Sequence, residues 1–147
     1  MDIDARIIDN ITGKSHNLPM TFDTGAYMTS VDSGILVEMG YDIMDAKDTI
    51  VDTVGRKGML AKEIVLRGFE LENVDGSIIP LGPVLAHAID MSDIFTVGVV
   101  GLNIIREFRT IIEFGNPTTI ELVPTFDITD LCVFDEFSSV ASRFGEW

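Results

Sequence analysis

Short apolar runs separated by turn-forming residues are the main pattern along this chain. Valine, isoleucine, leucine and phenylalanine gather in these runs, and turn formers such as Thr12-Gly13 and Gly115-Asn116 stand between them. This pattern is typical of strands, so it predicts a mostly β fold rather than a helical bundle. The predicted strands are Arg6 to Asp9, Asn17 to Phe22, Tyr27 to Val31, Thr49 to Val54, Met59 to Leu66, Ser77 to Ile79, Pro83 to Ile89, Phe95 to Val100, Arg109 to Phe114 and Thr119 to Val123.

Between the predicted strands, a helical pattern occurs in two short segments. Asp32-Ser33 can cap a helix that runs to Glu38 or Met39, and Gly40 fits just past its end. The second predicted helix is Gly101 to Glu107. We therefore expect one or two short helices beside the strands.

Two segments stand apart from this regular pattern. Thr49 to Val54 and Met59 to Leu66 form a long predicted hairpin. Its tip consists of Val54, Gly55, Arg56, Lys57 and Gly58. After Val123 the chain becomes acidic and aromatic, with apolar residues at roughly helical spacing. We therefore expect a domain over residues 1–123 and a tail over residues 124–147, the tail being a weak helix or a docked segment.

Length and charge narrow the class of protein. The 147 residues suffice for one domain, and 24 acidic against 10 basic residues give a formal charge of −14. Such a chain repels phosphate backbones, so nucleic acid is not an expected partner. There is no signal-peptide pattern, and the longest apolar run, Val97 to Ile105, is interrupted by glycines, so no membrane span is expected. With Cys132 as the single cysteine, we expect a cytoplasmic protein.

One loop carries residues suited to catalysis. Asp23-Thr24-Gly25-Ala26 directly follows an apolar strand, so the Asp23 carboxylate would be held on rigid backbone. Gly25 permits a tight loop and the close approach of a second backbone, and Thr24 has a hydroxyl that can hydrogen-bond across an interface. An ordinary turn is the alternative interpretation, because all three residue types are common in turns.

Three segments in order favour the catalytic interpretation. They are the hydrophobic-Asp-Thr-Gly-Ala segment from Phe22 to Ala26, the hairpin with glycines at its tip, and the segment Val99 to Ile105. The last has paired hydrophobics, a glycine, and Asn103 among aliphatics. Through them, residues from Arg6 to Val123 resemble the retropepsin-like aspartic peptidases, in their single-domain homodimeric branch. The resemblance implies a closed barrel of short strands with the hairpin as a flap.

The resemblance also implies roles for single residues. Asp23 would be the catalytic aspartate, Thr24 would lock the active-site loops of two subunits together, and Gly25 would contact the substrate backbone. Ala26 completes this loop, and residues 54–58 would form the flap tip. The second motif would pack beneath the catalytic loop through Val99, Val100, Gly101 and Asn103.

The chain departs from the viral members of this family in two respects. Many of them have an acidic residue after the alanine and an arginine after the second glycine, and these two residues pair. Tyr27 and Leu102 stand at those positions here, so both partners of that pair are changed. The two motifs are also farther apart than in compact viral members, with the extra length expected between Phe69 and Asp93.

The chemistry implied by the resemblance requires a second chain. Two carboxylates about 3 Å apart must share one proton, so that one activates water and the other polarises the peptide carbonyl. This chain contains a single Asp-Thr-Gly, so a homodimer would supply the second aspartate. The resulting prediction is an aspartic endopeptidase that acts on a peptide or protein substrate. The other carboxylates, including Asp32, Asp52, Asp90 and Asp93, read as surface charges, turn formers or caps.

Several alternatives remain open at this point. A homodimer of this fold could bind peptides or assemble partners without cutting them. The tail could be a dimerisation segment or a strand that blocks the groove. Tyr27, Met28 and Met59 are candidates to line a substrate groove, with core packing as the alternative. No cofactor or metal is expected, because His16 and His87 share no motif and read as structural histidines.

Overall fold

The computed structural model describes residues 1–53, 56–94 and 96–125, and the mostly β class with two short helices is confirmed there. The early elements are β1 (Asp2–Ile8), β2 (Ser15–Phe22), β3 (Ser30–Asp32), α1 (Ser33–Glu38), β4 (Lys47–Thr53), β5 (Arg56–Leu66) and β6 (Phe69–Glu72). The later ones are β7 (Ile78–Leu81), β8 (Val84–Ile89), β9 (Gly98–Val100), α2 (Leu102–Ile105), β10 (Phe108–Glu113) and β11 (Thr119–Pro124). None of the described helices has the length and apolarity needed to cross a membrane.

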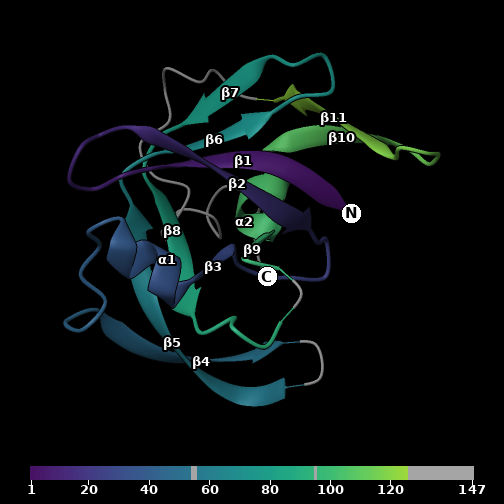
Figure 1. Cartoon of the computed structure of the whole chain (residues 1–147). Coiled ribbons are helices and arrows are strands. Elements are labelled where there is room, and N and C mark those ends of the chain that lie inside the picture. Colours follow the sequence, from purple (N-terminus) through teal and green to yellow (C-terminus); the bar gives the residue numbers. More distant parts are fainter. Residues whose placement is uncertain (54–55, 95, 126–147) are drawn as a thin grey trace.

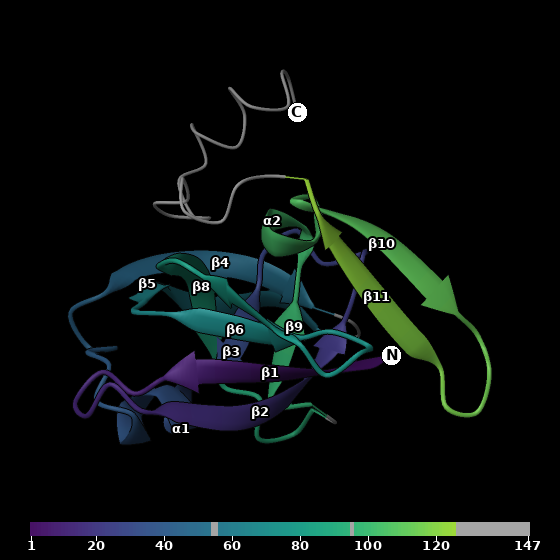
Figure 2. The same ribbon diagram turned by 90° about the horizontal axis from the view of Figure 1, so that it is seen from above.

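Nine strands form one curled sheet in the order β4-β5-β8-β3-β9-β2-β1-β6-β7, and β10 pairs with β11 separately (Figure 1). Closure into the expected barrel is not seen in the described residues. The strand order ends at β4 on one side and β7 on the other, because each is the outer arm of a hairpin and pairs along one side only. Figure 2 shows the β10–β11 hairpin set apart from the sheet, with α2 near its base.

The main core follows from strict alternation in the strands. In β1, Ile3, Ala5 and Ile7 are buried, and in β2, Leu18, Met20 and Phe22 are buried with exposed or half-buried residues between them. Successive side chains of a strand point to opposite faces, so this alternation gives each strand one buried face. These residues join one large cluster that also takes in β5 to β8, both helices and the β10–β11 hairpin.

A second, much smaller cluster lies under the β4–β5 hairpin. Its buried members are Met59, Ala61, Ile89 and Met91, with Val51 and Ile94 packed against them. Ile64 and Leu66, farther along β5, join the main core instead. The main core therefore holds the body of the sheet, while the hairpin rests on a cluster of its own, which we call the flap cluster.

The element boundaries differ from the sequence prediction in a few places. β1 begins at Asp2, because Ile3 already faces the core between two exposed aspartates. β6 was not predicted, since Gly68 looks like the end of the preceding run. β3 is only Ser30–Asp32, because the residues before it belong to the loop that follows Asp23. The first helix is confirmed: Asp32 accepts the Ile35 N–H with a 3.2 Å bond, and Gly40 follows it with φ of 82°.

The second helix, α2, is shorter than the expected Gly101 to Glu107. Gly101 is its extended N-cap, and Arg106 closes it with bonds to Leu102 and Ile104. β11 runs to Pro124, and most of the expected tail, residues 126–147, lies outside the described residues.

Candidate active site

Asp23 begins a loop that two neighbouring strands hold in place. β2 and β9 run parallel, with Thr21 opposite Val99 and Phe22 opposite Val100. The Asp23 N–H continues this pairing with a 3.1 Å bond to the Val100 carbonyl. The backbone of Asp23 is therefore fixed by the sheet, whereas its side chain is half-buried and faces a groove.

The loop after Asp23 is a tight turn that fixes the carboxylate. The Gly25 N–H donates a 2.8 Å bond to Asp23 Oδ1, and the Ala26 N–H donates a 3.2 Å bond to the Asp23 carbonyl. A Cβ on Gly25 would lie 3.1 Å from that carboxylate oxygen, so a side chain there would press on it. Thr24 and Gly25 are exposed at the tip of the turn. All four residues predicted for this loop thus lie in one turn.

The second predicted motif packs directly against the loop. The Leu102 N–H donates a 2.8 Å bond to the Ala26 carbonyl. A Cβ on Gly101 would lie 2.5 Å from the carbonyl carbon and oxygen of Met28 and 2.8 Å from the Thr29 nitrogen. Only glycine permits this approach, because backbone atoms cannot move aside as a flexible side chain can. Val100 is fully buried beneath the loop, while Val99 reaches the groove.

A buried hydrogen-bond network joins the two motifs. Asn103 Oδ1 accepts bonds from the Thr29 N–H and the Thr29 hydroxyl, each 2.8 Å long. Asn103 Nδ2 donates a 3.0 Å bond to the Leu85 carbonyl, and Thr29 Oγ1 accepts a 3.1 Å bond from the Gly101 N–H. The network ties the Asp23 loop, α2 and β8 together. Asn103 was predicted as a packing residue, whereas Thr29 was missed because nothing local in the sequence marks it as the partner.

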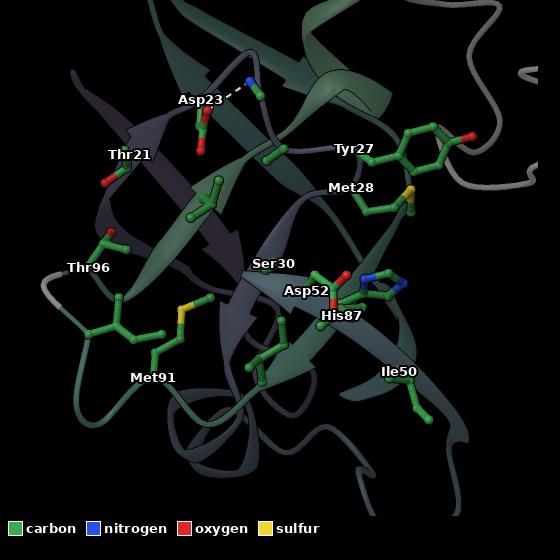
Figure 3. A pocket seen from close by; sticks show the side chains of 16 residues that line it. Thr21, Asp23, Tyr27, Met28, Ser30, Ile50, Asp52, His87, Met91 and Thr96 are labelled. Carbon is green, nitrogen blue, oxygen red and sulfur yellow. Dashed lines mark hydrogen bonds between the residues drawn. The ribbon is translucent and has the colours of Figure 1, made fainter. Parts of the chain in front are cut away.

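The groove in front of Asp23 has a volume of about 530 Å³. β4 contributes one wall and the segment between β8 and β9 another, with the Asp23 loop at one side (Figure 3). Tyr27 and Met28 line it, as expected, whereas Met59 does not line it and lies in the flap cluster. The described residues that line the groove are Thr21, Asp23, Gly25, Ala26, Tyr27, Met28, Ser30, Ile50, Val51, Asp52, His87, Ile89, Met91, Ile94, Thr96 and Val99.

The predicted flap tip is only partly described. Arg56, Lys57 and Gly58 open β5, whereas Val54 and Gly55 lie outside the described residues. The Gly58 N–H donates a 2.9 Å bond to Asp52 Oδ1, and Gly58 has φ of 67°, a conformation that favours glycine.

Arg56 reaches out of the flap to a neighbouring segment. Its Nη1 lies 2.6 Å from Asp93 Oδ1, while 42% of the Arg56 side chain and 67% of the Asp93 side chain stay exposed. The ion pair fastens the flap to the segment that carries Met91 and Ile94. In this arrangement Arg56 serves that contact, and it is not among the residues that line the groove.

His87 reaches the groove, although it was predicted to be a structural histidine. It is a half-buried residue of β8 and lies opposite Ser30 of β3 and Glu63 of β5. Burial lowers the pKa of His87 below its ordinary value of 6.5, and the nearby Glu63 carboxylate opposes this shift in part. The imidazole is therefore mainly neutral at pH 7. In the described part of the chain, no three His, Cys, Asp or Glu side chains gather as metal ligands would.

Comparisons with known proteins support the fold. No family model matches the chain, and no curated protein matches its sequence. A retropepsin-like aspartic protease from Rickettsia conorii superposes with a TM-score of 0.55 and 17% identity, covering 82% of this chain and 88% of that one. The retroviral protease-like domain of Ddi1 from Leishmania major gives 0.48 and 16%, covering 89% and 97%. The first likeness confirms that this chain has the retropepsin-like fold.

Proposed function

We propose that this chain is one subunit of a homodimeric aspartic endopeptidase in which the Asp23 carboxylates of two copies share a proton. The observation that carries the proposal is the position of Asp23. It follows a sheet strand, its carboxylate is fixed by the Gly25 N–H at 2.8 Å, and it faces a groove of about 530 Å³. A substrate in that groove would lie against the carboxylate.

The exposed tip of the loop fits the need for a second copy. Thr24 and Gly25 are open to solvent in the single chain, next to an aspartate that must come within about 3 Å of its counterpart. A two-fold axis beside this tip would bring the same residues together from both copies, because such an interface is self-complementary. Thr24 would then hydrogen-bond across the axis.

The β10–β11 hairpin offers an apolar surface for the same partner. Phe114 is 82% exposed, and Ile111 and Val123 are each 38% exposed. The hairpin is bound to the body through Asn73, which donates a 2.8 Å bond to the Leu122 carbonyl and accepts a 2.9 Å bond from the Leu122 N–H. Exposed apolar residues on a separate hairpin are typical of a surface that a partner covers.

The reaction follows from two carboxylates that share one proton. The ionised Asp23 takes a proton from a water molecule, and the water oxygen bonds to the carbonyl carbon of the substrate. The protonated Asp23 of the other copy donates to the carbonyl oxygen as negative charge develops on it. The intermediate collapses when the Asp23 that took the water proton passes it to the peptide nitrogen, a hydroxyl of the intermediate gives a proton to the other Asp23, and the carbon–nitrogen bond breaks. One product carries the new carboxyl terminus and the other the new amino terminus, and the two Asp23 carboxylates again share one proton.

The groove suits an extended peptide. β4 is an edge strand, so its backbone groups can pair with a substrate strand, and side chains of alternate substrate residues would point into the groove. The groove has apolar lining from Ile89, Met91 and Ile94, which predicts that at least one substrate position is apolar.

The test is cleavage of a diverse peptide library between pH 4 and pH 7 by the wild type and by Asp23→Asn. We expect discrete cuts with the wild type only, and a dimer for both proteins by sedimentation. Asn keeps the size of the side chain and its acceptor oxygen for Gly25, so the variant should fold. Identical cutting by both proteins would reject Asp23 as the catalytic group. No cutting by either, with peptide binding retained, would favour a non-catalytic peptide-binding module.

A further inference from the structure

The groove has two chemically different sides. On one side, Met91 and Ile94 of the segment after β8 give an apolar wall. On the other, Tyr27, Asp52 and His87 bring a phenol, a carboxylate and an imidazole to the same cavity. Figure 3 shows this division, with Met91 and Thr96 on one side and the labelled Tyr27, Met28, Asp52 and His87 on the other. A peptide that lies along the groove would therefore meet two kinds of subsite.

The charges on the groove wall have one sign. Among the described residues that line the cavity, Asp23 and Asp52 are the acidic ones, and none is Lys or Arg. Arg56, at the start of β5, is paired with Asp93 at 2.6 Å. An unpaired positive charge on a substrate would be attracted to this wall, and a carboxylate would be repelled by it.

His87 and Asp52 come from different strands that the sheet holds firmly. The backbone N–H of His87 donates a 2.9 Å bond to the Thr29 carbonyl, so His87 is tied to the loop that follows Asp23. Asp52 is held by the 2.9 Å bond that its Oδ1 accepts from Gly58. A side chain between these two residues would therefore meet fixed partners.

Glu63 of β5 is the neighbour of His87 in the sheet. It lies directly opposite His87, and its Oε2 is 3.7 Å from the Nζ of Lys47, a side chain that is largely exposed. Glu63 does not line the groove. It contributes negative potential behind His87 but would not contact a substrate, so we assign it a secondary role.

We propose that Asp52 and His87 form a subsite that selects a lysine or arginine side chain of the substrate. The carboxylate of Asp52 and the acceptor nitrogen of a neutral His87 ring would take N–H groups of the basic side chain. Tyr27 and Met28 would pack against its aliphatic stem, and an aromatic face also attracts cations. The assignment rests on the proposed function, because it concerns a subsite of the same groove.

The test measures binding separately from cleavage. Fluorescent peptides derived from the best cut sequence would carry lysine, norleucine or glutamate at each position in turn. Their affinity for the full-length Asp23→Asn variant is measured by anisotropy, and their cleavage by the wild type is measured in parallel. At one position we expect lysine to be preferred over norleucine by about tenfold, as a charge-assisted hydrogen bond allows, with glutamate bound least.

Two further variants locate the preference. Asp52→Asn removes the charge but keeps an acceptor for Gly58, and His87→Leu removes the imidazole. Each should reduce the lysine preference to about twofold or less. The matched control is Asp48→Asn, which removes a carboxylate from the same strand, where Asp48 pairs with Lys62 at 2.7 Å outside the groove. Asp48→Asn should keep the preference.

The outcomes separate the two proposals. If the wild type cleaves in an Asp23-dependent way but no position prefers lysine, the subsite is overturned and the endopeptidase stands. The subsite is also overturned if Asp52→Asn and Asp48→Asn show equal preferences for lysine over norleucine. If nothing is cleaved by the wild type, peptides come from a binding screen instead. An Asp52-dependent preference for lysine would then support the subsite while the endopeptidase is rejected.

Discussion

The loop that carries Asp23 and the hairpin that faces it are supported in different ways. The loop rests on the main core and on the network of Thr29 and Asn103, which are 0% and 5% exposed. The hairpin rests on the flap cluster, which has four buried members, and on an ion pair between half-exposed and exposed side chains. Within the hairpin, the cross-strand pair Ile50 and Leu60 is open to solvent.

This difference fits the separate tasks that the proposed function gives to the two regions. A catalytic carboxylate must hold its position, so buried and mutually dependent contacts around it are an advantage. A flap must open for a substrate to enter, so its contacts should be few and local. We therefore expect changes near the loop to reduce global stability and changes near the flap to affect mainly local opening.

The largest expected effect is that of Gly101→Ala. The new Cβ would meet the Met28 backbone at 2.5 Å, so either the loop or α2 must move. We expect a loss of at least about 4 kcal/mol in the free energy of unfolding, enough to prevent folding. Urea denaturation followed by circular dichroism measures it, with protein concentration held constant.

Gly115→Ala is the matched control for this substitution. Its nearest neighbour would be 3.5 Å away, which is ordinary contact, so its stability should stay within about 0.5 kcal/mol of the wild type. If Gly101→Ala were as stable as Gly115→Ala, the second motif would not constrain the loop as described.

Asn103→Leu should have the next largest effect. The substitution keeps the approximate size of the side chain but removes the partner of the Thr29 N–H and of the Leu85 carbonyl. Buried polar groups without partners cost about 1–3 kcal/mol each, so we expect a loss of about 3 kcal/mol. The comparison variant is Asn73→Leu, because the Asn73 side chain also makes three hydrogen bonds but is only partly buried. Equal losses in urea denaturation would show that burial of the network does not matter.

The contrast between Asn103 and Thr29 also shows which parts of the site can be predicted from the sequence. Asp23 and the second motif could be proposed from the sequence because the residues of each motif are contiguous. Their mutual contact was expected only through the family resemblance. Thr29 and His87 were missed because their roles arise from strand pairing, which places Ser30 between His87 and Val99. Such a register joins distant segments, and no single segment encodes it.

The flap region shows the same limit. Its two strands were predicted from apolar runs around glycines, and β4 and β5 confirm them. Met59 was a candidate to line the groove, yet it packs in the flap cluster. Which face of β5 is buried depends on its pairing with β8, and the sequence of β5 alone does not specify that pairing. The pairing of Arg56 with Asp93 likewise depends on a tertiary contact.

Met91→Ala tests the flap cluster. Met91 is 5% exposed, and its removal leaves a cavity beside Met59 and Ile89. We expect a loss of about 2 kcal/mol, at the low end for such substitutions, because the segment after β8 can partly collapse into the space. Hydrogen exchange should accelerate in β4 and β5 and change little in β1 and β2. Uniform acceleration in all four strands would show that the flap does not open independently.

Arg56→Gln should have the smallest effect on stability. The ion pair with Asp93 is short but partly solvated, so it should contribute about 1 kcal/mol or less, and less again at high salt. Its effect should be visible locally, because it joins the flap to the wall that carries Met91. A double-mutant cycle with Asp93→Asn, read from hydrogen exchange of the Gly58 N–H at low and at high ionic strength, isolates the pair.

Lys57→Gln is the control for that cycle, since it removes the same charge from the adjacent exposed position. We expect Arg56→Gln to speed exchange at Gly58 more than Lys57→Gln does, with a coupling to Asp93 that fades as salt is added. Equal acceleration by both variants would mean that net charge, rather than the ion pair, governs the flap. In that case the flap cluster alone would hold the hairpin closed, and Met91→Ala would remain the stronger way to open it.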